Sequence, residues 1–94
     1  MFLLLLTYVK PLAEVDALMR KHVGWLDEHY AAGRFLVSGR RIPRTGGVIV
    51  ACGDDRAEIE ALAATDPFVA GGVATCEVIE FRASQRARGL DRLL

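Results

Sequence analysis

Two stretches of the chain are apolar at almost every position. Phe2 to Val9 and Val48 to Gly53 lack the alternation of apolar and polar residues that marks a strand with one exposed face. Continuous apolar runs of this length are typical of strands that are covered on both faces. We therefore expect both runs to form strands near the centre of a sheet.

A helical pattern follows the first run, from Leu12 to about Ala32. Pro11 suits the first turn of a helix, and Gly33 is the residue expected just beyond its end. Apolar residues recur at helical spacing and predict one long helix with a buried stripe. That stripe consists of Val15, Met19, Val23, Leu26 and Tyr30, and it is flanked by Leu18 and Trp25.

Both histidines of the chain, His22 and His29, belong to this predicted helix. At about 100° per residue, His22 falls inside the apolar sector and is expected to face the sheet. His29 lies in the same sector two turns later, at a rise of about 10 Å. Two imidazoles so far apart cannot share one metal ion, so the helix carries no zinc-binding pair.

A strand and a hairpin are predicted after this helix. Arg34 to Arg41 alternates apolar and mixed positions, which predicts a strand with Ser38 and Arg40 on one face. Ile42 to Gly47 contains a proline and two adjacent glycines. This composition predicts the hairpin connection to the second apolar run.

A second helix and a last strand complete the pattern. The helix is predicted to open with Asp55 and Glu58, which have the spacing of a capping box. It is predicted to end at Thr65 because Pro67 forbids its continuation. The last strand is expected from Val73 to about Arg82.

The order strand, helix, strand, strand, helix, strand is that of an α+β, ferredoxin-like βαββαβ fold with a four-stranded antiparallel sheet. Right-handed crossovers place both helices on one face of that sheet. The other face then stays uncovered, although the two central strands are apolar on both sides. A second copy of the sheet is the most economical cover, so we expect a homodimer that forms through the open sheet face.

The chain of 94 residues makes a single domain, residues 1–94, in which 12 basic and 12 acidic side chains balance. Such a balance indicates no nucleic-acid partner. We assign residues 1–82 to the core of the domain and residues 83–94 to a C-terminal tail. The tail contains Arg86, Arg88 and Arg92, and we expect it to be solvated or packed against a partner.

The apolar start of the chain is too short to span a bilayer and has no positively charged leader, so we expect no membrane partner. Cys52 and Cys76 are the only cysteines, and their spacing matches no zinc pattern. In the predicted sheet they lie roughly 9 to 10 Å apart, beyond the reach of a disulfide. Two free cysteines indicate a reducing compartment, and we expect a cytoplasmic protein.

Asp66 stands directly before Pro67, between the second helix and the last strand. The residue before a proline is pushed toward an extended or turn geometry, so this carboxylate has a defined direction. An Asp-Pro pair is also a common loop starter, and Asp66 can be interpreted as a turn residue only. With His22 it would form an acid/base pair from two distant segments.

Three segments of the chain resemble the YciI-like proteins, also called the YCII-related domain family, within the dimeric α+β barrel group. They are His22 in the first helix, Ala32 to Gly39 at the end of that helix and in the second strand, and Asp66 to Val73 with its Asp-Pro-aromatic motif. With the order of elements they cover nearly the whole chain up to Phe81. The resemblance implies a ferredoxin-like fold, a dimer and an active site built on the histidine and the aspartate.

The best-known activity assigned in that family is a dehydrochlorinase that acts on a chlorinated hydroxyquinol. Our leading hypothesis is accordingly a cofactor-independent lyase or isomerase that acts on an unidentified small molecule, in which His22 moves a proton and Asp66 orients it. Developing oxyanion charge needs a donor, and Ser38, Arg40 and Tyr8 are the candidates. Arg40 stands where the family often has proline after glycine, and we expect an arginine there to add an anion contact.

The alternative is a non-catalytic module that binds a small ligand or plays an accessory role. In that case His22 and Asp66 form a structural hydrogen bond that holds the first helix to the turn, since a fold alone does not imply catalysis. The sequence contains no cluster of ligands for a metal. The two hypotheses differ in solvent access, because an enzyme needs an open cavity beside His22 and a structural pair can be sealed.

Overall fold

The two apolar runs form the central strands of the sheet. β1 (Phe2–Tyr8) pairs with β3 (Gly46–Ala51) on one side and with β4 (Ala74–Glu80) on the other. β2 (Phe35–Arg40) pairs with β3, which makes the order β2-β3-β1-β4 with all pairs antiparallel. The computed structural model describes residues 1–90 and confirms the α+β, ferredoxin-like arrangement.

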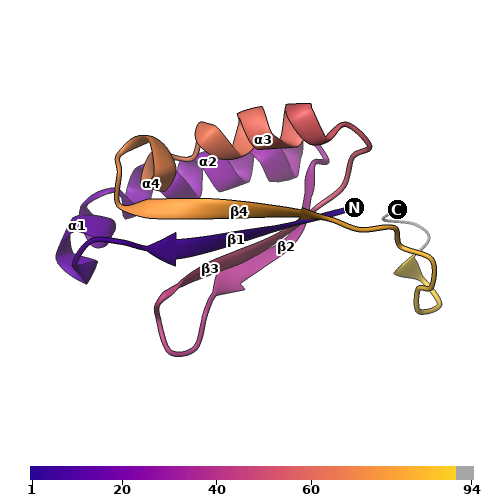
Figure 1. Cartoon of the computed structure of the whole chain (residues 1–94), viewed down its shortest axis with the longest axis horizontal. Helices are drawn as coiled ribbons and strands as arrows, with labels where there is room; N and C mark the ends of the chain where they lie inside the picture. The colour runs from indigo at the N-terminus through magenta and orange to yellow at the C-terminus, as the bar shows by residue number, and fades with distance from the viewer. Residues whose placement is uncertain (91–94) are drawn as a thin grey trace.

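The helices are α1 (Leu12–Ala17), α2 (Met19–Ala31), α3 (Arg56–Ala64) and α4 (Pro67–Ala70). Figure 1 shows α2 and α3 side by side over one face of the sheet, with α1 beyond the end of β1. The opposite face carries no helix in residues 1–90. Within the same residues, none of the helices has the length and apolar character that crossing a bilayer requires.

The core lies between the helices and the covered face of the sheet. Along β1 the side chains of Phe2, Leu4 and Leu6 are buried there, at 0%, 0% and 3% exposure. Burial of each such side chain contributes roughly 1.5 to 3 kcal/mol. The rest of the core consists of Val15, Trp25, Phe35, Ile49, Ala51, Ile59, Leu62, Ala63, Phe68, Val73 and Ala74.

Two glycines are required by the backbone. Gly33 follows α2 with a φ of 76°, the left-handed conformation that ends many helices, as predicted. Gly46 opens β3 so close to β1 that a Cβ there would lie 1.8 Å from the backbone oxygen of Leu6. Any side chain at position 46 would therefore force β3 away from β1.

The first helix differs from the prediction because it is broken at Leu18, which ends α1 and precedes α2 with φ −104° and ψ 1°. No proline or glycine marks this point in the sequence. The predicted buried stripe is also partly wrong, since Val23 and Tyr30 are exposed, whereas Trp25, predicted only to flank the stripe, is buried. Trp25 packs against Phe35 of β2, and Val23 lines a cavity between α2 and the sheet that is partly open to solvent.

A bulge in β2 changes which residues share a face. The register with β3 shifts between Phe35 and Val37, which inserts one extra residue into the strand. As a result Phe35 and Ser38 both contact Tyr30 of α2, although strict alternation would place them on opposite faces. Val37 is 58% exposed.

The structure also differs from the prediction after the end of the second helix. α3 begins as predicted, because the Asp55 carboxylate accepts the backbone N–H of Glu58 at 3.2 Å. After its end at Ala64, a short additional helix, α4, stands where we predicted only a turn. Residues 81–87, which follow β4, form neither helix nor strand, and Arg92 of the predicted tail lies outside the described residues.

Candidate active site

Asp66 is placed by the start of α4. It is the N-cap of that helix, and Pro67 takes the first helical position, where the missing N–H of proline costs nothing. The Oδ1 atom of Asp66 accepts the backbone N–H of Phe68 at 2.9 Å. The side chain is only 1% exposed, so the carboxylate is held rigidly inside the fold.

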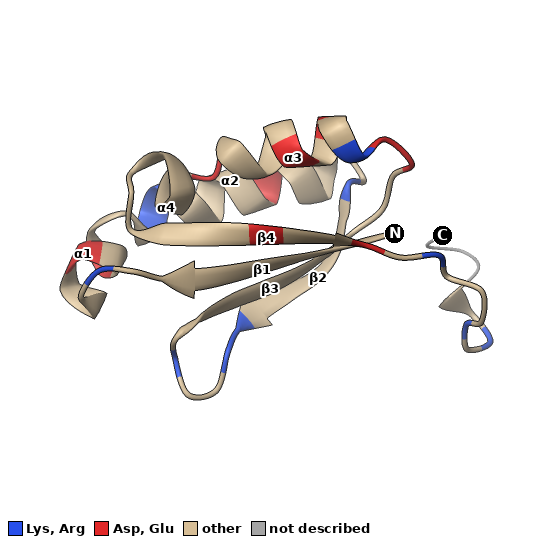
Figure 2. Ribbon diagram, in the orientation of Figure 1, with Lys and Arg blue, Asp and Glu red and all other residues tan. Residues whose placement is uncertain are grey.

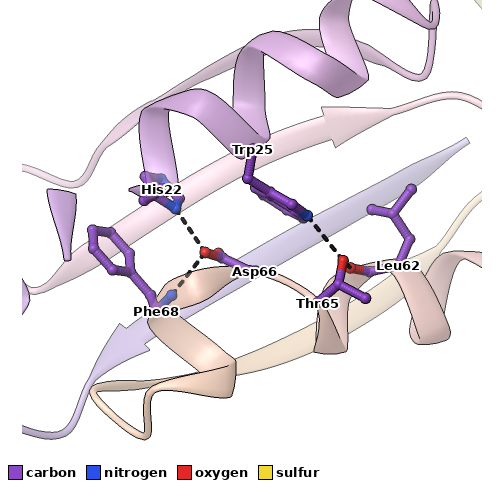
Figure 3. Close-up of polar contacts among 6 residues, drawn as sticks. All are labelled: His22, Trp25, Leu62, Thr65, Asp66 and Phe68. Atoms are coloured by element: carbon purple, nitrogen blue, oxygen red, sulfur yellow. Dashed lines mark hydrogen bonds and ion pairs between the residues drawn. The ribbon is translucent and has the colours of Figure 1, made fainter. Parts of the chain in front are cut away.

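His22 reaches this carboxylate from α2. Its Nδ1 atom lies 2.7 Å from Asp66 Oδ1, across 44 positions of sequence (Figure 3). Because Oδ1 already accepts the Phe68 N–H, it acts as an acceptor, and the proton of this bond belongs to Nδ1. The other ring nitrogen, Nε2, makes no hydrogen bond within residues 1–90 and serves as the acceptor of the neutral ring.

Phe68 fixes the plane of the His22 ring. The two rings stack with their centroids 3.9 Å apart and their planes within 8° of each other. Tyr8 meets the same phenyl ring edge-on at 5.9 Å. One aromatic residue of α4 therefore contacts two of the residues that the sequence proposed for the site.

A second polar link runs parallel to the first. Trp25 Nε1, one turn after His22, donates to Thr65 Oγ1 at 2.9 Å, and that hydroxyl donates to the Leu62 carbonyl at 2.6 Å (Figure 3). These bonds tie α2 to the end of α3. Two neighbouring bonds between the same segments limit rotation of α2 and hold His22 in register with Asp66.

A cavity of about 140 Å³ lies between α2 and the sheet and is partly open to solvent. His22, Tyr8, Ser38 and Arg40 all line it, whereas Asp66 stands behind His22. His22 is 12% exposed, so its ring is reachable. The remaining lining is mostly apolar and includes Leu6, Met19, Val23, Leu26, Ile49 and Phe68.

The polar residues of the cavity have partners that the sequence did not reveal. Ser38 Oγ lies 2.6 Å from the hydroxyl of Tyr30. Arg44, in the hairpin between β2 and β3, lies with its guanidinium carbon 5.9 Å from the centre of the Tyr8 ring. We had placed Tyr30 in the core and assigned no role to Phe68 or Arg44. The position of Phe68 directly after Asp66-Pro67 was the only sequence signal that pointed to one of these three residues.

The other titratable groups lie apart from this pair. Burial lowers the pKa of His29. The charge of Glu28 raises this pKa, and the charge of Arg34 lowers it further. Burial, together with the charge of Asp66, raises the pKa of Cys76 to about 11.

Both Cys52 and Cys76 are free. Within residues 1–90, no three histidine, cysteine or acidic side chains gather into a metal site.

Comparisons with known proteins agree with this fold. The structure of 5-chloro-2-hydroxyhydroquinone dehydrochlorinase from Burkholderia phenoliruptrix, in complex with 2,5-dihydroxybenzoquinone, is similar with a TM-score of 0.68. The similarity covers 87% of this chain and 94% of that chain at 18% sequence identity, and it shows a shared fold. A comparison with curated protein sequences gives no match.

The sequence profile of the YCII-related domain matches residues 1–82, which is also the range that we assigned to the core of the domain. The match includes His22, Asp66 and every residue that lines the cavity between α2 and the sheet. The chain therefore belongs to the YCII-related domain family.

Proposed function

We propose that this protein is a cofactor-independent enzyme of the lyase or isomerase type that acts on a small molecule. The observation that carries the proposal is the 2.7 Å contact between His22 and a buried Asp66, with the same imidazole lining an open cavity. A structural pair needs no access to solvent, whereas a proton-transfer group does. The cavity beside His22 thus favours catalysis.

In this mechanism His22 Nε2 is the general base. It accepts a proton from the substrate, the electrons of the broken bond form a new double bond, and a leaving group departs with its own electron pair. Asp66 holds the ring by Nδ1 and stabilises the imidazolium that forms. In an isomerase the same imidazolium returns the proton to another atom of the substrate.

Donors for a developing negative charge lie on the same cavity. Tyr8, Ser38 and Arg40 line it opposite α2, on β1 and β2. Hydrogen bonds aimed at an oxyanion are strongest where water is scarce, and the apolar walls of this cavity provide that condition. The similar fold of a dehydrochlorinase, which eliminates chloride, supports an elimination reaction here.

One observation favours the alternative of a non-catalytic module. Asp66 is needed as the cap of α4, and His22 stacks on Phe68 of the same helix, so the pair also fastens α2 to α4. A carboxylate with this structural task would be retained without catalysis. An experiment must therefore separate the proton-transfer role from the packing role.

The test starts from 5-chloro-2-hydroxyhydroquinone, the substrate of the dehydrochlorinase with the similar fold, and related chlorinated hydroquinones, with chloride release as the readout. In His22→Asn the side-chain amide replaces the Nδ1 donor to Asp66 but has no counterpart of Nε2. Turnover should fall about 10²- to 10⁴-fold in this variant and in His22→Ala. Asp66→Asn should slow turnover less, because it removes the charge and keeps an acceptor.

His29→Phe serves as the matched control, since it changes the other histidine of α2 outside the cavity. It should turn over at the parental rate. If a folded His22→Asn protein also turns over at that rate, the imidazole carries no proton and the non-catalytic alternative holds. Circular dichroism of each variant confirms that the fold is intact.

The same proposal includes a homodimer through the open sheet face. Leu3, Leu5 and Val50 project from that face, because they alternate with the buried residues of β1 and β3. An apolar groove of about 340 Å³, which Val37 and Val50 help to line, adjoins them. Light scattering should give twice the mass of the chain, and Val50→Glu should give the monomer.

We also place the protein in the cytoplasm, where cysteines stay reduced. Cys52 and Cys76 are both free, which agrees with a reducing compartment. Fractionation of cells that express the chain should recover it with cytoplasmic proteins. Recovery from an oxidising compartment would contradict this assignment.

A further inference from the structure

The cavity beside His22 has one cationic side chain without a direct partner. Arg40 is the last residue of β2, is exposed, and lines the cavity. Within residues 1–90 its guanidinium makes no hydrogen bond and no ion pair with a carboxylate. A planar guanidinium in this state is available to a ligand, with donors that match two oxygens of a carboxylate.

The neighbouring arginine is already occupied. Arg44 Nη2 donates to Asp16 Oδ1 of α1 at 2.5 Å, and the same guanidinium lies beside the Tyr8 ring. The hydrogen bond from Arg44 is the main reason why the pKa of Asp16 is lowered, and Arg40 adds a smaller Coulomb contribution. Asp16 is thus committed to Arg44 and only senses Arg40 from a distance.

This leaves an excess of positive charge at the mouth of the cavity, since Arg44 takes Asp16 and Arg40 has no carboxylate partner. Figure 2 shows the basic residues along the hairpin between β2 and β3 and acidic residues on α1. The excess is local, because the chain as a whole carries 12 basic and 12 acidic side chains. A ligand with one negative charge would give Arg40 the partner that it lacks within residues 1–90.

The apolar part of the cavity limits the size and shape of that ligand. Met19, Val23 and Leu26 of α2 form one wall, and Leu6 and Ile49 of the sheet form the other. Its volume of about 140 Å³ is close to the roughly 150 Å³ of an engineered apolar cavity that holds one benzene ring. One six-membered ring therefore fits between the helix and the sheet.

We infer that the cavity binds a small ring-bearing carboxylate, with the ring between α2 and the sheet and the carboxylate on Arg40. This inference rests on the proposed function, because the ligand that it describes is the substrate of His22. Arg40 is a specificity-determining residue in this arrangement. The Asp16–Arg44 pair occupies the guanidinium of Arg44 and leaves Arg40 as the anion contact of the cavity.

The experiment compares benzoate with benzamide, which have nearly the same shape and differ in charge. Titration calorimetry gives the affinities, and the NMR signals of the His22 ring report binding in the cavity. The parent protein should bind benzoate about tenfold more tightly than benzamide, and this preference should weaken between about 0.05 M and 0.5 M salt. Arg40→Gln should abolish the preference and leave the affinity for benzamide unchanged.

Arg41→Gln is the matched control, since Arg41 is the next residue, is also exposed, and does not line the cavity. It should retain most of the preference for benzoate. Asp16→Asn removes the local carboxylate and frees Arg44, so it should strengthen benzoate binding. A weaker affinity for benzoate in Asp16→Asn would overturn the inference, as would an equal loss in both arginine variants.

Two further outcomes separate this inference from the proposed function. Equal binding of benzoate and benzamide beside His22 overturns the anion contact but leaves a ligand cavity for the enzyme. If neither probe shifts the His22 signals, the inference fails and the proposed function loses its accessible site as well. Circular dichroism of the arginine variants shows whether each one is folded.

Discussion

His22 and His29 occupy the same face of α2, two turns apart, and the structure gives them different surroundings. His22 pairs with the carboxylate of Asp66 and lines a cavity. His29 is 9% exposed and lies among the aromatic rings of Trp25 and Phe35. Its ring nitrogen contacts the Arg34 guanidinium at 3.4 Å, a weak contact by hydrogen-bond standards.

The difference shows that the position of a histidine on a helix does not decide its chemistry. The Asp66 carboxylate orients the His22 ring through Nδ1, whereas burial and the nearby Arg34 lower the pKa of His29 and favour its neutral ring. Only the first surrounding suits a group that gains and loses a proton during turnover. The following predictions test this contrast, from the largest expected effect to the smallest.

Removal of Asp66, the partner of His22, should lower the free energy of unfolding far more than removal of Arg34, the neighbour of His29. Asp66→Ala eliminates the cap of α4 and leaves the His22 and Phe68 N–H groups without their acceptor. We expect the free energy of unfolding to fall by about 3 kcal/mol. Arg34→Ala, the corresponding change beside His29, should cost less than about 1 kcal/mol. Urea denaturation of both variants measures the difference.

The hydrogen bond between Trp25 and Thr65, beside the His22–Asp66 pair, should have an intermediate effect on stability. Thr65→Val removes the acceptor of the Trp25 indole N–H, so the free energy of unfolding should fall by about 1 to 2 kcal/mol. Trp25→Phe is the partner variant for a double-mutant cycle. A coupling energy near zero between the two substitutions would show that this bond does not hold α2 in place.

Cys76 can report the charge of Asp66. Burial and, to a smaller extent, the Asp66 carboxylate raise the pKa of Cys76 to about 11. In Asp66→Asn the pKa of Cys76 should fall but stay above 9.0, because burial, the larger cause, remains. The rate of Cys76 alkylation by iodoacetamide, followed by mass spectrometry from about pH 8 to pH 10, measures it. An unchanged rate profile would mean that Asp66 carries no charge near Cys76.

His29 should produce a small pH dependence of stability. Its pKa is lowered from 6.5 by burial, so the unfolded chain binds a proton more readily than the folded chain. The contribution of His29 to the free energy of unfolding is therefore fully present above pH 6.5. It declines as the pH falls below that value. His29→Phe should remove this part of the decline. Denaturation midpoints of the two proteins, compared well above and well below pH 6.5, provide the measurement.

The sequence determined the order of the strands, the central place of β1 and β3, and the proximity of His22 and Asp66. Continuous apolar runs, helical periodicity and the Asp66-Pro67 junction are local signals, and they do not depend on contacts with distant segments. For the same reason His22 could be placed on an inward helix face. The predicted contact between His22 and Asp66 is present in the structure.

Tertiary structure decided what these local signals could not contain. No local signal in the sequence marks the break at Leu18 or the bulge in β2, and the bulge brings Ser38 to the side of Tyr30. The stacking of His22 on Phe68 and the capture of Arg44 by Asp16 join residues 28 or more positions apart. Such contacts depend on distances in the folded chain, so the sequence names the residues and only the fold shows which of them meet.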